Sequence, residues 1–406
     1  MAIASKFINP YRPGAGHMPT YLAGRAHEKT EFLRLLEQNT IFENLILTGL
    51  RGVGKTVLLE TLKPIAIREK WLWVGTDLSE AASLSESNIA TRMMSDLALV
   101  TSSIVIGKRE LPGSMGFLPS RPKEEEITLN FETLTQIFNG TPGLSSDKIK
   151  AVLEVVWKAV DACGFKGVVF AYDEAQNMSD HAAKEQYPLS TMLDVFQSIQ
   201  KKGIRFMLCL VGLPTLFPKL VDSRTFSERM FHVLTLDRLK DQDSRDAIKE
   251  PISDSKCPVH FSDAGIDAIV SASGGYPYFI QFICRELFDA YLQNGKGVPV
   301  AEAARKLDSD FFMGRWSRAT DRQRELLWVV ASLENCDGEF TVQEVSEMSA
   351  KILKKRISPS QISQMFSKLS DAGLVYKNRH GKYVFAVPLL GQFVRRQMEL
   401  PNSGSP

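Results

Sequence analysis

The segment from Gly49 to Thr56 carries residue types that could bind the phosphates of a nucleotide. It reads Gly-Leu-Arg-Gly-Val-Gly-Lys-Thr, which is the spacing of a phosphate-binding loop. Glycines let the backbone curl so that consecutive N–H groups point at phosphate oxygens, and a helix that begins there adds its positive end. Lys55 would neutralise the β- and γ-phosphates, and the Thr56 hydroxyl would bind Mg²⁺. The residues expected to contact ATP in this segment are Gly49, Gly52, Val53, Gly54, Lys55, Thr56 and Val57.

A pair of acidic residues, Asp173 and Glu174, follows an apolar run in the middle of the chain. A carboxylate at the C-terminal end of a buried strand sits where ligands bind in open α/β sheets. Asp173 would hold Mg²⁺ through water, and Glu174 would orient and polarise the attacking water. Together with the phosphate loop, this pair favours hydrolysis of ATP over phosphoryl transfer to a small acceptor.

Both groups depend on strands that would position them. An apolar run at 44–48 leads into the phosphate loop, and a helical pattern follows from Val57. Further apolar runs occupy 71–74, 167–172, 206–211 and 231–236. Apolar strands that alternate with helices indicate a parallel sheet covered on both faces. The expected fold class is therefore α/β, with a P-loop parallel-sheet core.

Four sequence segments occur in the order found in AAA+ ATPases. They are Leu22-Ala23-Gly24-Arg25, the phosphate loop, Tyr172-Asp173-Glu174-Ala175-Gln176, and Gly274-Gly275-Tyr276-Pro277-Tyr278-Phe279-Ile280-Gln281. Over roughly residues 20–295, the chain resembles the branch of that family shared by origin-recognition initiators, archaeal-type and STAND ATPases, and transposition ATPases. The resemblance implies an AAA+ core, a small helical lid and a C-terminal winged-helix domain.

The resemblance also assigns roles to residues outside the phosphate loop. The residues expected in the adenine pocket and in the nucleotide-sensing turn of the lid are Leu22, Ala23, Gly24, Arg25, Tyr276 and Pro277. Arg229, just before the last core strand, would act as an arginine finger on ATP bound by a neighbouring subunit, with Arg224 as the alternative. A finger that acts in trans implies a homo-oligomer.

Two positions depart from the family pattern. The lid helix of the initiators usually carries an arginine that contacts the γ-phosphate, and Arg285 comes too late in the helix to match it. Many AAA+ proteins also have a polar residue at the end of the fourth strand, where it helps to orient the water. Val211 and Gly212 cannot do this, and Thr215 is a weak substitute. We therefore expect slow ATP turnover without a partner.

The last part of the chain has the pattern of three helices followed by a hairpin, which is the order of a winged helix. In the third helix, at 359–372, the apolar residues fall on one face and leave Ser, Gln and Lys outward. Ser and Gln hydrogen-bond bases and phosphates, while Lys and Arg contact phosphates. Residues 315–400 hold 14 Lys and Arg against 9 Asp and Glu. The residues expected to contact duplex DNA are Ser360, Gln361, Gln364, Lys368, Arg379 and Lys382.

The expected domain boundaries follow from where the strand pattern begins and stops. An extended N-terminal arm takes residues 1–20, and the AAA+ core takes 21–240. The helical lid takes 241–298, the winged-helix domain 315–400 and a flexible tail 401–406. Within the core, the stretch at about 104–141 is expected to be an irregular insertion, because Gly and Pro recur there without a clear period.

The overall composition is that of an ordinary globular chain. Of its 406 residues, 44% are hydrophobic and 24% are charged, and the formal net charge is +2. The whole-molecule charge thus favours no class of partner. Five scattered cysteines without a CxxC pair argue against a metal cluster. The N-terminus lacks the apolar core of a signal peptide, and no apolar run approaches the roughly 20 residues of a membrane span. We therefore expect a cytoplasmic protein that does not contact a membrane.

These features favour an ATP-hydrolysing AAA+ switch, with ATP and Mg²⁺ as cofactors, that binds duplex DNA through its winged helix. It would assemble in an ATP-dependent way and be of initiator, mobile-element or defence type. One alternative is a STAND-type signalling ATPase, whose winged helix contacts protein rather than DNA and which regulates a separate effector. A second alternative is a regulator that delivers DNA to a partner enzyme.

Overall fold

Five apolar segments form one parallel sheet in the computed structural model, which describes residues 7–14, 16–111, 123–295, 297–379 and 381–399. In sheet order the strands are β2 (Trp71–Val74), β5 (Gly167–Tyr172), β6 (Phe206–Gly212), β1 (Asn44–Gly49) and β7 (Phe231–Leu236). The pairs β2–β5, β5–β6 and β6–β1 are parallel in register. Every residue of β1, β5 and β6 is buried, as suits strands covered on both faces. The predicted α/β fold with a parallel sheet is confirmed.

The chain divides into two compact units. The first, here called the sheet unit, contains Ala26–Thr48 and Leu58–Thr235. The second, called the lid unit, contains Met1–Arg25, Gly49–Val57 and Leu236–Pro406. The phosphate loop therefore belongs to the lid unit, whereas Asp173 and Glu174 belong to the sheet unit.

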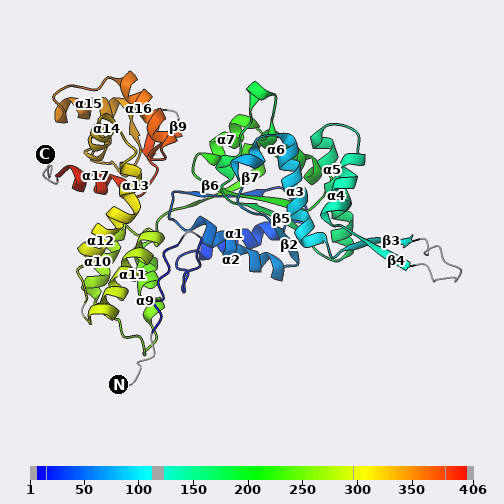
Figure 1. The fold of residues 1–406 in the computed structure, drawn as a ribbon, viewed down its shortest axis with the longest axis horizontal. Coiled ribbons are helices and arrows are strands. Elements are labelled where there is room, and N and C mark those ends of the chain that lie inside the picture. The colour runs from blue at the N-terminus through cyan, green and yellow to red at the C-terminus, as the bar shows by residue number, and fades with distance from the viewer. Residues whose placement is uncertain (1–6, 15, 112–122, 296, 380, 400–406) are drawn as a thin grey trace. The chain divides into compact units, whose positions relative to one another are not determined.

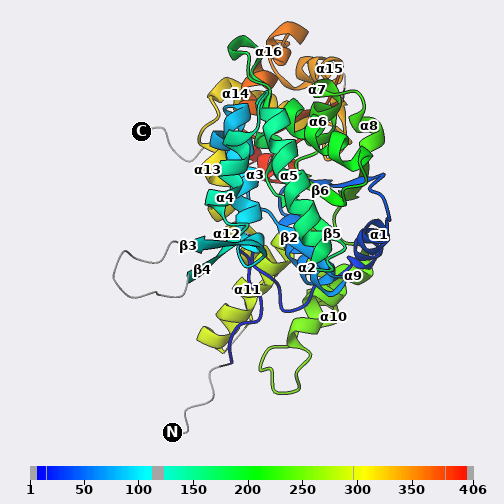
Figure 2. The same ribbon diagram turned by 90° about the vertical axis from the view of Figure 1, so that its right-hand side faces the viewer.

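Eight α-helices with the following bounds accompany the sheet among the described residues up to Leu236. They are α1 (Ala26–Leu36), α2 (Lys55–Arg68), α3 (Glu86–Thr101), α4 (Phe131–Gly140), α5 (Ser145–Ala162), α6 (Pro188–Lys201), α7 (Leu216–Ser223) and α8 (Ser227–Met230). Figure 1 shows α1 and α2 on one face of the sheet and α3, α5 and α6 on the other. Helices α3, α4 and α5 lie side by side (Figure 2). Their apolar faces and the sheet form one core, in which Phe170 packs edge-on against Phe196 at 5.1 Å between ring centroids.

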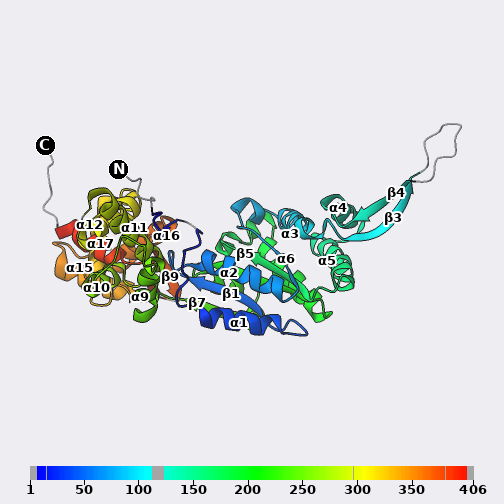
Figure 3. The same cartoon turned by 90° about the horizontal axis from the view of Figure 1, so that it is seen from below.

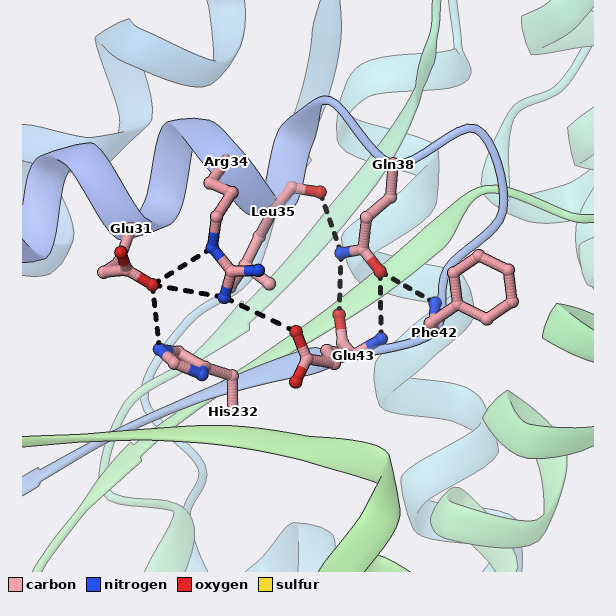
Figure 4. A network of polar contacts seen from close by, with 7 residues as sticks. All are labelled: Glu31, Arg34, Leu35, Gln38, Phe42, Glu43 and His232. Carbon is pink, nitrogen blue, oxygen red and sulfur yellow. Dashed lines mark hydrogen bonds and ion pairs between the residues drawn. The ribbon is translucent and has the colours of Figure 1, made fainter.

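A polar network fixes the turn between α1 and β1 (Figure 4). The Gln38 carboxamide accepts from the N–H groups of Phe42 and Glu43 at 2.8 and 2.9 Å and donates to the Glu43 carbonyl at 3.0 Å. Glu31 accepts from Arg34 at 3.1 Å, and its carboxylate lies 3.3 Å from His232 Nε2 on β7. These contacts set where β1 begins, and thus where the phosphate loop leaves the sheet.

The interval at 104–141 is more regular than its sequence pattern indicates. It contains an antiparallel ribbon, β3 (Val105–Leu111) with β4 (Lys123–Thr128), and the helix α4. The ribbon extends beyond α4 (Figures 1 and 3). The expectation of an irregular stretch is thus wrong for the described part, because the runs of charged residues at 108–110 and 123–126 hide the alternation that predicts a strand. Residues 112–122 lie outside the described residues.

The lid unit contains a bundle of α9 (Asp241–Lys249), α10 (Asp263–Ser273), α11 (Pro277–Asn294) and α12 (Val300–Leu307). The N-terminal arm packs on this bundle. Tyr11 is buried and its hydroxyl donates to the Ile248 carbonyl at 2.5 Å, while Asn9 donates to the Arg285 carbonyl at 3.1 Å. Burial raises the pKa of the Tyr11 hydroxyl. The described residues 7–14 of the arm contain no helix or strand, and side-chain hydrogen bonds hold them on the bundle.

The C-terminal elements of the lid unit follow the predicted order. They are α13 (Met313–Trp316), α14 (Asp321–Ala331), β8 (Phe340–Thr341), α15 (Val342–Ile352), α16 (Pro359–Asp371), β9 (Val375–Arg379), β10 (Lys382–Phe385) and α17 (Leu390–Glu399). The three strands form an antiparallel sheet in the order β8-β10-β9. Thr341 and Ser358 cap α15 and α16 with reciprocal hydrogen bonds to Glu344 and Gln361. None of the helices in the described ranges is long and apolar enough to cross a membrane.

Candidate nucleotide site

The phosphate loop connects β1 to α2, which begins at Lys55. Gly52 and Gly54 have φ angles of 81° and 89°, a region that side chains other than glycine rarely adopt. At Gly49 a Cβ atom would lie 2.4 Å from the Leu236 carbonyl oxygen, so that a side chain cannot fit there. The predicted glycines are thus required by backbone conformation or by close approach of another strand.

Lys55 lies across the loop that it follows. Its ammonium group donates to the carbonyl oxygens of Gly49 and Leu50, at 2.9 Å each. The Lys55 side chain is half-buried, and Thr56 and Val57 beside it are also half-buried. The N-terminal end of α2 and this ammonium group supply positive charge at one place, which fits the triphosphate of a nucleotide.

Arg25 holds the phosphate loop from outside. Its guanidinium group donates to the carbonyl oxygens of Val53 and Asp237, both at 2.9 Å, and the residue is 7% exposed. Ala23 is buried in the apolar cluster of the lid bundle. The structure therefore places Ala23 and Arg25 against the lid and the loop, while their contact with adenine, like that of Leu22 and Gly24, stays a prediction.

The turn that opens α11 touches the phosphate loop. Tyr276 precedes Pro277, the first residue of α11, and the Tyr278 N–H donates to the Gly52 carbonyl at 3.2 Å. This turn is where nucleotide sensing is expected. Arg285 lies two turns further along α11, where it bonds to Glu286 at 2.8 Å and stacks over Phe282. Arg285 is thus engaged in a local ion pair.

The acidic turn, Asp173 to Asn177, belongs to the sheet unit. Asp173 is 5% exposed and its backbone pairs with the segment after β2, with Leu78 N–H donating to the Asp173 carbonyl at 2.9 Å. Its carboxylate accepts from the Glu174 N–H at 2.7 Å. Glu174 is exposed and has φ and ψ of 51° and 32°, a left-handed conformation that is costly for a non-glycine residue. Such strain is common at functional sites.

Gln176 and Gly212 lie against each other beside Glu174, and the sequence predicted no role for this pair. The Gln176 carboxamide bonds to the Glu174 carboxylate and to the Leu213 N–H at the end of β6. Lys219 donates to the Gln176 carbonyl at 2.7 Å. Burial lowers the pKa of Lys219, and the charge of Asp180 partly offsets that effect. The signals in the sequence were a glutamine two positions after Glu174 and a glycine where a polar residue was expected.

The two candidate finger arginines differ in their surroundings. Arg224 donates two hydrogen bonds to Asp194, at 2.8 and 2.7 Å, and this contact raises the pKa of the Arg224 guanidinium. Arg229 is exposed on α8, and its guanidinium has no hydrogen bond or ion pair with any described residue. Arg229 is therefore the arginine that could reach another subunit without breaking an ion pair.

The predicted DNA-facing residues of α16 lie on its exposed face. Ser360, Gln361, Gln364 and Lys368 are exposed, and Ile362, Phe366 and Leu369 are buried beneath them. On the hairpin, Lys382 is half-buried and lies near Glu344, whose pKa is lowered by hydrogen bonds from Thr341 and, less, by the Lys382 charge. The side chain of Arg379 lies outside the described residues.

The residues expected to bind Mg²⁺ are Thr56 in the phosphate loop and Asp173 in the acidic turn. Within the ranges that the structure describes, no three His, Cys, Asp or Glu side chains gather as a metal site. Mg²⁺ commonly takes one or two protein oxygens and completes its shell with phosphate oxygens and water. The Thr56 hydroxyl and the Asp173 carboxylate are oxygen ligands of the kind that Mg²⁺ takes, and their binding of the ion stays a prediction.

A family model described as a domain of unknown function (DUF8462) matches residues 309–394. No curated protein matches the sequence. Among solved structures, the Walker-type ATPase of Pyrococcus abyssi is similar, with 15% identity, 92% of this chain and 96% of that chain covered, and a TM-score of 0.57. The ORC2 protein of Aeropyrum pernix in its ADP form has 14% identity, 95% and 98% coverage, and a TM-score of 0.53. At such identities the likeness shows the fold alone, which is the AAA+ ATPase fold.

Proposed function

We propose that this chain is a Mg²⁺-dependent ATPase that switches between conformations with its nucleotide. The observation that carries the proposal is the phosphate loop, where Lys55 caps two loop carbonyls and Arg25 holds a third. On binding ATP, Lys55 would exchange these carbonyls for phosphate oxygens, since an ammonium group bonds more strongly to an anion than to a neutral carbonyl.

Thr56 and Asp173 would each provide an oxygen ligand for Mg²⁺, which would supply charge stabilisation to the phosphates when bound. Glu174 would accept a hydrogen bond from the attacking water and align it with the γ-phosphate. Phosphoryl transfer depends chiefly on positioning and charge, so these residues need no covalent step. Arg229 of a neighbouring subunit would add positive charge in the transition state, and the active form would then be a homo-oligomer assembled with ATP.

The nucleotide part of the proposal is tested by calorimetric titration of ATP into wild type and Lys55→Ala. Removal of the ammonium group should weaken ATP binding by about 100-fold. The melting temperature without nucleotide should change little, because Lys55 is not part of an apolar core. Unchanged ATP affinity in Lys55→Ala would show that this loop is not the nucleotide site.

We propose further that the C-terminal elements bind duplex DNA through α16 and the hairpin β9–β10. The support is a face of small polar and basic side chains on α16, laid over a buried apolar face, in a region with an excess of Lys and Arg. Such a helix can enter a major groove with its polar face, while nearby lysines contact phosphates.

A second candidate function is a latch, in which the C-terminal elements sense the nucleotide instead of DNA. The observation that favours it is an approach between Arg51 in the phosphate loop and Gly373 after α16. A Cβ atom on Gly373 would lie 3.8 Å from the Arg51 guanidinium. Burial lowers the pKa of Arg315, and the charges of Arg51 and Arg318 lower it further, so several cations gather here. An anion such as a phosphate would relieve their repulsion.

One experiment separates the two candidates. Lys368→Glu combined with Lys382→Glu should weaken duplex binding and flatten its salt dependence by about 0.9 log unit per lost phosphate contact. Basal ATP turnover should stay unchanged. Lys63→Glu with Lys158→Glu, two exposed positions of the sheet unit, is the control with the same change in charge. Unchanged duplex affinity with altered basal turnover would instead support the latch.

A further inference from the structure

A side-chain bridge in the sheet unit joins the acidic turn to the end of β6. Gln176 Nε2 donates to Glu174 Oε2, and Gln176 Oε1 accepts from the Leu213 N–H at 3.1 Å. Leu213 directly follows β6, the strand whose end has Val211 and Gly212 in place of a polar side chain. Gln176 thus brings a polar group to the strand end that has none of its own.

The two contacts define how the carboxamide of Gln176 is oriented. Its oxygen faces an N–H donor, and its nitrogen faces a carboxylate, which can only accept. The reversed amide would set its oxygen against the Glu174 carboxylate and its N–H₂ against the Leu213 N–H, and both contacts would be repulsive. Among the described residues, Gln176 provides the one side-chain hydrogen bond to the Glu174 carboxylate.

Gly212 makes room for this bridge. A Cβ atom at position 212 would lie 2.6 Å from Gln176 Oε1 and 3.0 Å from the end of the Leu216 side chain. The backbone at Gly212 does not have a positive φ, so its conformation does not require glycine. The absence of a side chain at this position is therefore explained by the carboxamide that occupies the space.

The backbone of the acidic turn is held from two further directions. Lys219 Nζ donates to the Gln176 carbonyl at 2.7 Å, and Asn177 Nδ2 donates to the Leu78 carbonyl at 2.9 Å. These contacts hold a turn that begins with Glu174 in a left-handed conformation. A strained residue persists where its surroundings over-determine it, and here the surroundings include the side chain that bonds to its carboxylate.

We propose that Gln176 is a positioning residue that orients the Glu174 carboxylate for its contact with the attacking water. It does so in place of the polar residue that the end of β6 lacks. This inference rests on the proposed ATPase function. One oxygen of Glu174 is held by the Gln176 amide, and the exposed carboxylate keeps its other oxygen for water. No bond is made or broken at Gln176.

The first test is Gln176→Leu, which removes both hydrogen bonds at similar volume. Steady-state turnover of ATP should fall by about 10- to 100-fold, because misplacement of a reacting group by about 1 Å costs that much. The Kd for ATP should stay within about twofold. Gln136→Leu, which removes an exposed Gln–Glu contact on α4, is the matched control and should leave both quantities unchanged. A turnover in Gln176→Leu equal to or above that of wild type would overturn the proposal.

The second test is Gly212→Ala, which displaces the carboxamide without changing its chemistry. It should lower turnover as Gln176→Leu does. In the double variant Gly212→Ala/Gln176→Ala the two losses should not add, because the methyl group then meets no carboxamide. Fully additive losses would contradict a shared bridge.

If wild type does not hydrolyse ATP, the proposed function itself fails. Normal hydrolysis in wild type that is lost in Glu174→Gln but intact in Gln176→Leu refutes this inference alone.

Discussion

The phosphate loop and the acidic turn are both short connections after buried strands, but they hold their shape in different ways. The loop curves because Gly52 and Gly54 adopt positive φ angles, and Lys55 bonds back to it over five and six positions. The acidic turn contains a strained Glu174 and is held by Leu213 and Lys219, which are 37 and 43 positions from Gln176. Residues close in the sequence set the conformation of the phosphate loop, whereas residues distant in the sequence set that of the acidic turn.

This difference leads us to expect that the phosphate loop determines ATP affinity and the acidic turn determines ATP turnover. In the proposed function, the N–H groups of the loop and the Lys55 ammonium group would bind the phosphates in the ground state and in the transition state alike. The Glu174 carboxylate of the acidic turn would act only when water attacks the γ-phosphate. Interactions made equally in both states change affinity, and those made in the transition state alone change turnover. Substitutions in the lid unit's loop should therefore alter ATP affinity, and those in the sheet unit's turn should alter turnover.

The largest effect is expected from Gly49→Ala. Its Cβ atom would meet the Leu236 carbonyl at 2.4 Å, and backbone on both sides cannot move cheaply. ATP affinity should fall by more than about 100-fold, and the melting temperature should fall by about 4–8 °C, since a backbone clash strains the folded state as well. Gly140→Ala is the control, because a Cβ atom there has no atom within 4 Å. Calorimetry checks the ATP affinity, and thermal melts check the melting temperature. Wild-type ATP affinity in Gly49→Ala would contradict the assignment of this loop to ATP binding.

Arg229→Ala should affect turnover and leave affinity intact. Loss of a cation supplied in trans should lower ATP turnover by about 100-fold or more, with an unchanged Kd for ATP. Mixing Arg229→Ala with Lys55→Ala should restore activity, since one subunit then binds ATP and the other provides the arginine. Arg224→Ala is the comparison, because Arg224 is already paired with Asp194. Turnover that stays low at every mixing ratio, despite co-assembly, would count against a finger in trans.

Arg25→Met should weaken ATP binding by about tenfold. The methionine cannot donate hydrogen bonds to the Val53 carbonyl of the loop and to the Asp237 carbonyl, so the loop is held less firmly. The turnover of fully loaded enzyme should change less than twofold. Arg305→Met removes an exposed arginine of α12 and serves as the control. Titration with ATP beside turnover at saturation checks the prediction. If only the turnover fell and the ATP affinity stayed the same, Arg25 would not be needed for ATP binding.

Lys219→Met should have the smallest effect, a fall in turnover of about three- to fivefold with unchanged affinity. The lysine bonds to a backbone carbonyl of the acidic turn rather than to Glu174, so its loss loosens the turn without freeing the carboxylate. Lys202→Met, which removes an exposed ion pair with Glu154, is the control. Steady-state kinetics over a range of ATP concentrations separate turnover from ATP affinity. A changed affinity would contradict the prediction that the acidic turn affects turnover alone.

The sequence predicts the parts of the fold and of the site that depend on neighbouring residues, and it does not predict those that depend on contacts between distant segments. The glycines and Lys55 are contiguous, so a local pattern identifies them, and the buried runs predict the sheet. Gln176 and Gly212 escaped because their roles depend on a contact between two distant segments. Arg25 was identified, but the hydrogen bonds of its guanidinium to the loop carbonyls follow from the fold. The ribbon β3–β4 escaped because its charged strands lack an apolar alternation.

The most direct test is a single-turnover experiment with labelled ATP, using excess wild type and excess Glu174→Gln. Wild type should convert bound ATP to ADP in Mg²⁺ and not in EDTA. Glu174→Gln should bind ATP with wild-type affinity and convert it at least about 100-fold more slowly, because the amide cannot supply the charge of the carboxylate. Conversion at the wild-type rate by Glu174→Gln, or no conversion by wild type in Mg²⁺, would contradict the account.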